Sequence, residues 1–341
     1  MTKAGTGRIT FAGLCGALAA LLVACTVAGV SPASAQTCTV TGGSGTYVSS
    51  GVVGGVDVLS GAAISAVSSA PVVVNCTGAA NRVVRACVEL GVGNNYQASL
   101  TQRSLAGANA GLVHDFYTNA AHSTIWGAWG TYFYPYGPGG VQVDVTLGAN
   151  GKGASAAMPI YGLIAANQQT VPPGTYTWTT ASPGLEYAYL GTTPCPLTNG
   201  VQIATSGATW TANVIKNCLL TPSPLNFGAV SVLTSAVTAS TTLGVQCTNT
   251  TPYSVGLDGG VTAGTGASPT ARQLAKGAAR VTYGLYQDAA HATPWGNTSA
   301  NWVAGTGTGL VQNYAIYGQV PAQTTPASGA YSDTVTVTVT F

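Results

Sequence analysis

Charged side chains are scarce in this sequence, whose 341 residues include only 10 Lys and Arg and 8 Asp and Glu. This balance supplies no basic surface for a nucleic-acid backbone or an anionic membrane, so neither is expected as a partner. The composition is not that of a disordered chain either, because 46% of the residues are hydrophobic. We expect a folded protein whose surface is polar through hydroxyl groups rather than through charges.

Helical periodicity is missing after residue 36, and so is any unbroken apolar run of the ~18–20 residues that a membrane span requires. Short runs rich in Val, Thr and Tyr are instead separated by Gly, Pro and Asn, and Gly alone accounts for 46 residues. Such a pattern is typical of strands joined by turns, so the sequence predicts an all-β fold.

Groups that carry catalysis or hold metals are also few. His114 has an acidic neighbour, Asp115, but no third ligand or activated nucleophile accompanies the pair. Glu89 and Glu186 are the only glutamates, and their distance in the sequence gives no argument for a glycosidase pair. No two cysteines have the CxxC spacing of a zinc site. We therefore expect no enzyme, no cofactor and no metal.

The first residues predict a secretory signal. Lys3 and Arg8 precede an apolar stretch over residues 9–30, and Ala33-Ser34-Ala35 is a small-x-small cleavage site. Residues 1–35 are expected to be removed, which leaves Gln36 as the mature N-terminus and a formal charge near zero. One alternative stays open, because residues 22–25 (LVAC) also resemble a lipoprotein signal that would leave a lipid-anchored surface protein with Cys25 at its N-terminus.

An internal repeat organises the rest of the chain, because the same short motifs return in the same order. It predicts two related domains, a first over residues 36–214 and a second over 215–341. The matching segments are 74–77 with 245–248, 103–105 with 272–274, 120–127 with 289–296, 160–162 with 316–318 and 174–176 with 329–331.

Six cysteines remain in the mature chain, and an even number in an exported protein predicts disulfides. The repeat places Cys38 and Cys76 in positions equivalent to Cys218 and Cys247, so each of these pairs is expected to be bonded. Cys87–Cys195 follows by elimination.

The second repeat contains six strand candidates, one fewer than the roughly seven strands of an immunoglobulin-type sandwich. They are 225–230, 241–247, 253–259, 278–288, 310–320 and 331–341. In the last candidate, Val335, Val337, Val339 and Phe341 share one face. No further strand follows, so we expect its neighbour in the sheet to be missing or supplied from outside.

The second repeat resembles the spore coat protein U domain family. The resemblance is carried by Cys218, Asn226-Phe227-Gly228, Cys247, Tyr283-Gly284-Leu285-Tyr286, Trp295-Gly296, Ile316-Tyr317-Gly318, Gly329-x-Tyr331-x-Asp333 and the terminal Val-Thr-Val-Thr-Phe. It implies an exported pilin, built as an incomplete immunoglobulin-like β-sandwich. A periplasmic chaperone, and later the adjacent pilin subunit, would supply the missing strand along the edge formed by Val335, Val337, Val339 and Phe341.

The whole arrangement, a signal and two such domains, is similar to the two-domain tip adhesins of archaic (Csu-type) chaperone–usher pili. This similarity implies export through the periplasm and an outer-membrane usher to the pilus tip at the cell surface. The second domain would join the fibre and the first would be an adhesive head, attaching cells to abiotic or host surfaces in biofilm formation. Cys38 is only the third mature residue, so no N-terminal extension is expected for donation to another subunit.

Two segments of the first domain are candidates for adhesive loops, since exposed aromatic and apolar side chains mark contact sites. The alternatives are that the aromatic run folds back onto the sandwich and that the valine run is an ordinary strand. Residues 207–214 are expected to give this domain its own closing strand. The candidate contact residues are Trp129, Tyr132, Phe133, Tyr134 and Tyr136 in one segment, and Val52, Val53 and Val56 in the other.

Other functions remain open. A lectin-like head would stack Tyr or Trp on a sugar ring and would be inhibited by free sugar. A structural spore-coat or pilus-shaft protein would lack binding loops.

Overall fold

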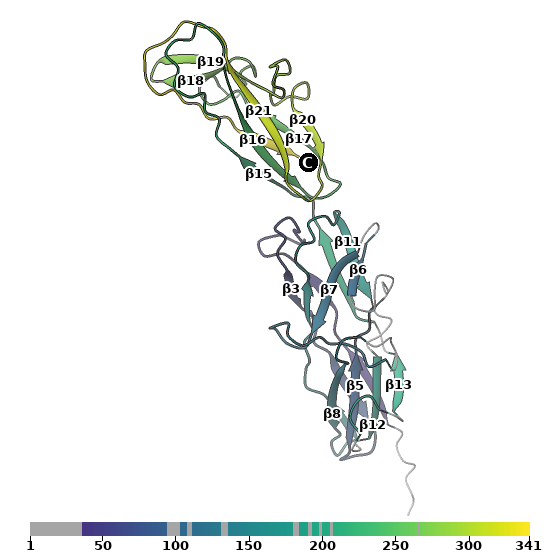
Figure 1. The fold of residues 1–341 in the computed structure, drawn as a ribbon. Coiled ribbons are helices and arrows are strands. Elements are labelled where there is room, and N and C mark those ends of the chain that lie inside the picture. Colours follow the sequence, from purple (N-terminus) through teal and green to yellow (C-terminus); the bar gives the residue numbers. More distant parts are fainter. Residues whose placement is uncertain are drawn as a thin grey trace, which may run out of the picture. The chain divides into compact units, whose positions relative to one another are not determined.

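The computed structural model describes residues 36–93, 103–107, 111–130, 136–179, 184–189, 193–197, 200–204, 207–264 and 266–341. The expected signal at residues 1–35 lies outside this range. The all-β prediction is confirmed, because the described residues form strands and turns (Figure 1). Among them no helix is long and apolar enough to cross a bilayer.

The strands fall into two consecutive groups that share no sheet. The first group, here called the first sandwich, has sheets ordered β1-β4-β9, β2-β14-β11-β6-β7-β10-β3 and β13-β12-β5-β8. Its strands are β1 (Thr37–Thr41), β2 (Gly45–Tyr47), β3 (Ile64–Val67), β4 (Val73–Thr77), β5 (Val83–Glu89), β6 (Arg103–Ala106), β7 (Gly111–Tyr117), β8 (Val141–Thr146), β9 (Lys152–Ala154), β10 (Tyr161–Ile164), β11 (Gly174–Thr179), β12 (Gly184–Tyr189), β13 (Val201–Ala204) and β14 (Thr209–Val214).

The second group, here called the second sandwich, has sheets ordered β15-β16-β21-β19-β18 and β20-β17-β22. Its strands are β15 (Cys218–Pro222), β16 (Val237–Cys247), β17 (Pro252–Leu257), β18 (Arg272–Lys276), β19 (Ala279–Tyr286), β20 (Val303–Thr306), β21 (Gln312–Val320) and β22 (Val337–Thr340).

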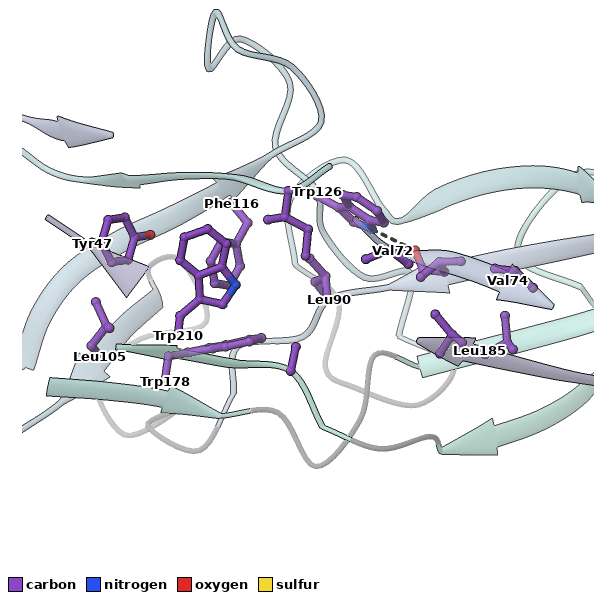
Figure 2. Close-up of a cluster of buried hydrophobic side chains, with 14 of the residues drawn as sticks. Tyr47, Val72, Val74, Leu90, Leu105, Phe116, Trp126, Trp178, Leu185 and Trp210 are labelled. Carbon is purple, nitrogen blue, oxygen red and sulfur yellow. Dashed lines mark hydrogen bonds between the residues drawn. The ribbon is translucent and has the colours of Figure 1, made fainter. Parts of the chain in front are cut away.

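Each sandwich buries its own core between its sheets. Strands such as β1 and β7 alternate buried and accessible residues, because successive side chains of a strand point to opposite faces. In the first sandwich the rings of Phe116, Trp178 and Trp210 pack together, with centroids 4.7 and 5.0 Å from that of Phe116 (Figure 2). Trp126 and Trp295 are the equivalent buried indoles of the two repeats.

Three disulfides join the expected pairs, Cys38–Cys76, Cys87–Cys195 and Cys218–Cys247. The first and third connect the equivalent strand pairs β1–β4 and β15–β16, where the two cysteines face each other in register. The second has no counterpart in the second sandwich and ties β5 to the segment after β12.

Two strand predictions need comment. The closing strand expected at 207–214 is present as β14, which lies between β2 and β11. The strand expected at 225–230 is wrong, because these residues are in irregular structure. The described part of residues 215–341 holds eight strands rather than six, since β15, β18 and β20 were not predicted and the strand at 225–230 is absent. The open position in the sheet therefore shows in the strand pairing and not in the number of strands.

Candidate functional site

The second sandwich has an open sheet edge at β22. This strand pairs with β17 through Leu257↔Val337, Val255↔Val339 and their neighbours. On its other side no strand pairs with it among the described residues of the second sandwich. An unpaired edge presents main-chain donors and acceptors to any strand that can align with it.

The direction of the backbone groups along this edge follows from two hydrogen bonds. The carbonyl oxygens of Thr334 and Thr336 accept from Val261 N and Asp258 N, so these residues face the β17 side. Successive residues of a strand direct their backbone groups to opposite sides. Val335, Val337 and Val339 therefore offer their N–H and C=O groups to the open side, while their side chains pack against the core.

The same edge is closed in the first sandwich. Trp126 Nε1 donates to Val88 O at 3.0 Å, and Trp295 Nε1 donates to Val255 O at 3.0 Å, which makes Val88 and Val255 equivalent. Val88 pairs with Leu185 of β12 and Val255 pairs with Val339 of β22. Leu185 has a second partner, Ile203 of β13, on its outer side. The chain thus carries a strand at the position that is open beside β22.

A cavity of about 550 Å³ continues the open edge toward the start of the last strand. The equivalent apolar positions of the first sandwich surround β14, whose Trp210, Ala212 and Val214 are buried in the core. The cavity is lined by segments 225–233 and 325–333 and by the core residues Val237, Leu274, Val281 and Val320. Edge and cavity together form a groove that has four core residues in its lining and, along one side, backbone groups with which no described strand pairs.

The predicted aromatic loop is only partly a surface feature. Trp129 is half-buried, and its indole lies against Gly139 and Gly140, where a Cβ would meet the ring at 2.2 and 2.7 Å. Tyr136 was expected on the surface, but it is 4% exposed and this expectation is wrong. Its hydroxyl donates to Asp115 at 2.7 Å and its ring lies under Arg103. The predicted contact residues Tyr132, Phe133 and Tyr134 lie outside the described residues.

The predicted valine loop is likewise divided. Val53 is fully exposed in the loop closed by the bond from Ser49 N to Gly55 O, and Val52 is half-buried. Val56 is completely buried, so its place among the contact residues is wrong. The Val56 N–H donates to Asn213 O, because the backbone of Val56 forms a parallel bridge with Val214, the last residue of β14. The valine segment bridges to Val214, whereas Ala128 and Tyr136 of the aromatic segment bridge to each other.

The buried arginines were recognised only as part of the repeat, and their role was missed. Arg103 and Arg272 are completely buried and donate to backbone carbonyls near the equivalent indoles, including Trp126 O at 2.7 Å and Trp295 O at 2.9 Å. Burial lowers the pKa of both guanidinium groups from their usual value. The sequence did contain a signal for this role, because each arginine has the same separation in sequence from its repeated Trp.

His114 and Asp115 do not form an acid–base pair, since they face opposite sides of β7. His114 Nδ1 lies 3.1 Å from the hydroxyl of Tyr47 in the core, and burial lowers the pKa of the imidazole well below its usual value. Asp115 Oδ1 accepts from Arg103 Nη1 at 2.5 Å. Within the described ranges no group of three or more His, Cys, Asp or Glu could hold a metal ion.

Comparison with known proteins connects this geometry to one family. The Spore Coat Protein U domain model matches residues 24–181 and 204–338. Protein U of Myxococcus xanthus is 35% identical over 127 residues, which cover 34% of this chain and 71% of that protein.

A solved structure of low sequence identity shows the same fold. A chain of the CsuC–CsuE chaperone–tip adhesion subunit complex from archaic Csu pili of Acinetobacter baumannii is 18% identical, with a TM-score of 0.50, over 89% of this chain and 100% of that one. The CupB6 tip adhesin of Pseudomonas aeruginosa is 10% identical, with a TM-score of 0.37, over 89% and 93% of the two chains.

Proposed function

Because the chain belongs to the Spore Coat Protein U domain family, we propose that it is the tip subunit of a chaperone–usher pilus. In this proposal the second sandwich, within residues 215–341, is the pilin domain that accepts a strand. The first sandwich, within residues 36–214, is the head that attaches cells to a surface, including in biofilms. A periplasmic chaperone, an outer-membrane usher and an adjacent subunit are the partners, and no reaction is catalysed.

The acceptor role rests on one observation: equivalent sheet edges are paired differently in the two sandwiches. Leu185 has Val88 on one side and Ile203 on the other, whereas within the described ranges Val339 is paired only with Val255. A donor strand along β22 would meet the free backbone groups of Val335, Val337, Val339 and Phe341. Its side chains would enter the apolar groove, so main-chain bonds supply alignment and buried area supplies affinity.

Amide hydrogen exchange tests this role with a control inside the chain. In the free mature chain, the amides of Val337 and Val339 should exchange quickly, because they have no partner strand. In assembled fibres they should be protected. The amides of Leu185 and Tyr187, which face β13, should be protected in both samples. Equal exchange of the β22 peptide in both samples would refute a donor strand at this edge.

The tip position has one further support. If cleavage follows Ala35, then β1 begins at Thr37, one residue after the mature N-terminus. Thr37–Thr41 pair with β4 inside the first sandwich, so these residues are not free to enter a neighbouring subunit. A subunit that accepts a strand and donates none would end a fibre.

The adhesive role rests on apolar side chains that the first sandwich leaves accessible. Val53 is fully exposed and Trp129 is partly accessible, with the predicted contact residues Tyr132, Phe133 and Tyr134 close after it in sequence. Burial of such groups against an apolar surface would contribute about 25 cal/mol per Å², multiplied over many pili.

Binding of the mature chain to polystyrene and to clean glass, in parallel, tests this role. Retention on polystyrene that persists in high salt is expected, and Trp129→Ser with Val53→Ser should weaken it. Trp302→Ser is the matched control, because Trp302 is a 39% exposed indole of the second sandwich. Inhibition of binding by free sugars would favour the lectin-like alternative. If Trp302→Ser weakened binding as much as Trp129→Ser with Val53→Ser, Trp129 and Val53 would not be the contact residues.

A further inference from the structure

Both sandwiches contain the same arginine scaffold. The Nε of Arg103 donates to Gly91 O at 2.9 Å, and its Nη2 donates to Leu90 O and Trp126 O. In the second sandwich Arg272 donates to the equivalent carbonyls of Leu257, Asp258 and Trp295. In both sandwiches the arginine thus connects the end of one strand, β5 or β17, to the turn that carries the repeated Trp.

The first sandwich adds an acidic and a phenolic group to this scaffold. Asp115 Oδ1 accepts from Arg103 Nη1, and Asp115 Oδ2 accepts from the Tyr136 hydroxyl at 2.7 Å. Asp115 follows His114, the cross-strand partner of Arg103. In the second sandwich Gly284 follows Tyr283, the partner of Arg272, and offers no carboxylate.

The addition coincides with a longer segment after the repeated Trp-Gly. Gly127 N donates to Gly139 O at 2.8 Å, and the equivalent Gly296 N donates to Asn301 O at 3.0 Å. The bond therefore encloses residues 128–138 in the first sandwich and only 297–300 in the second. Tyr136 lies in the segment that the second sandwich does not have.

Tyr136 closes the base of this longer segment. Its backbone and that of Ala128 exchange two hydrogen bonds of 2.9 Å, and the Arg103 guanidinium lies 4.2 Å from the ring centroid. Burial, followed by the nearby Asp115, raises the pKa of the Tyr136 hydroxyl, which keeps it protonated as a donor. A hydrogen bond to a carboxylate and a desolvated cation–π contact are both stronger than their exposed equivalents.

Trp129 leaves this closed base directly. It follows Ala128, and its indole rests on the Gly139–Gly140 backbone, where any side chain would collide with the ring. Its unburied part is thereby held at one place on the surface. A rigid aromatic group loses little conformational entropy when it binds, so fixing it before contact favours affinity.

We infer that Asp115 and Tyr136 form a clasp that positions Trp129 for contact with an apolar surface, added to an arginine scaffold that builds the fold without it. This inference rests on the proposed adhesive function and assigns positioning residues to it. Asp115 and Tyr136 do not touch the surface themselves. The second sandwich, which has the scaffold and lacks both groups, shows that a sandwich of this family needs neither.

Tyr136→Phe in the mature chain tests the clasp, because it removes one hydroxyl and keeps the ring under Arg103. Loss of a hydrogen bond to a carboxylate should speed amide exchange at Ala128 and Tyr136 about tenfold and weaken polystyrene binding about tenfold. Tyr283→Phe is the matched control, since the Tyr283 hydroxyl donates to Asp333 at 2.7 Å in the second sandwich. It should change neither quantity.

The outcomes separate the inference from the function beneath it. Unchanged exchange at Ala128 and Tyr136 would show that the clasp does not hold the segment. Faster exchange with unchanged polystyrene binding would show that positioning is irrelevant to contact, and either result overturns the inference. Failure of the wild-type chain to bind polystyrene would overturn the proposed function instead, and the exchange data would still report on the clasp.

Discussion

Leu185 and Val339 hold equivalent places opposite Val88 and Val255, but in the part of the chain that the structure describes only Leu185 has a strand on its outer side. Val339 turns its backbone N–H and C=O to the open edge, whereas Thr338, in register with Gly256, turns its own toward β17. Neighbouring residues of β22 thus direct their backbone groups to different partners. Proline substitution can distinguish the bonds to β17 from those offered to a donor strand, because each proline removes a single N–H.

Val339→Pro should leave the second sandwich stable to within about 1 kcal/mol, since this N–H faces the side of β22 where no described strand pairs. It should nevertheless prevent incorporation into fibres. Thr338→Pro should instead lower the free energy of unfolding by about 1–3 kcal/mol, because it removes a bond to β17. Denaturant titration and co-sedimentation with fibres measure both effects. Normal incorporation of Val339→Pro would contradict the acceptor edge.

The first sandwich should lose stability in mild acid through His114. Its pKa is lowered, first by burial and then by Arg103, so the unfolded chain binds a proton more readily than the folded one. The stability contribution is full above the unfolded pKa of about 6.5 and is lost as the pH falls below it. The slope should approach about 1.4 kcal/mol per pH unit.

His114→Gln tests this dependence, because glutamine does not titrate and keeps an acceptor for the Tyr47 hydroxyl. Urea titrations of the first sandwich between about pH 7.5 and about pH 5.5, roughly one unit on either side of the unfolded pKa of about 6.5, should show a flatter slope in the variant. An unchanged slope would assign the acid sensitivity to another group.

The disulfides should contribute unequally. Cys87–Cys195 closes a sequence separation of 108 and Cys218–Cys247 one of 29. On the chain-entropy account the longer loop gives about 1 kcal/mol more stability. Replacing both cysteines of each pair by Ala, and following each sandwich by denaturant titration, should reveal this order. The reverse order would show that native contacts, rather than loop closure, dominate.

The sequence predicted those parts of the fold that occur in both domains. Equivalent motifs gave the disulfides of β1–β4 and β15–β16, and the excess residues before the second repeat gave the strand β14. The strand predicted at 225–230 was wrong for a physical reason. Its equivalent in the first sandwich includes Tyr47 of β2, which is a strand because β14 pairs with it. Without a neighbour, residues around Phe227 stay irregular.

The predicted contact residues were less accurate because burial depends on partners far away in the sequence. The aromatic run gives no sign that Tyr136 lies under Arg103, and the valine run gives none that Val56 bridges to Val214. An exposed and a buried aromatic look alike when the partner is unknown. The repeat offered one clue, since Asp115 stands where the second domain has Gly284.

A self-complemented chain tests whether the second sandwich lacks a strand that a donor supplies. Residues 200–214, which form β13 and β14, would follow Phe341 through a Gly/Ser linker. The copied segment carries Trp210→Ala. In the first sandwich the Trp210 indole lies against Gly45, which has no side chain. The equivalent residue of the second sandwich is Leu225, whose side chain would collide with an indole at that place. The control is the same tail in scrambled order.

Thermal unfolding of the two chains decides the question. The native-order tail should raise the Tm of the second sandwich by about 10 °C, the equivalent of roughly 2 kcal/mol in a domain of this size. The Tm of the first sandwich should not change. Equal Tm values of the second sandwich with the native-order and scrambled tails would contradict the account, because the edge of β22 would then need no further strand.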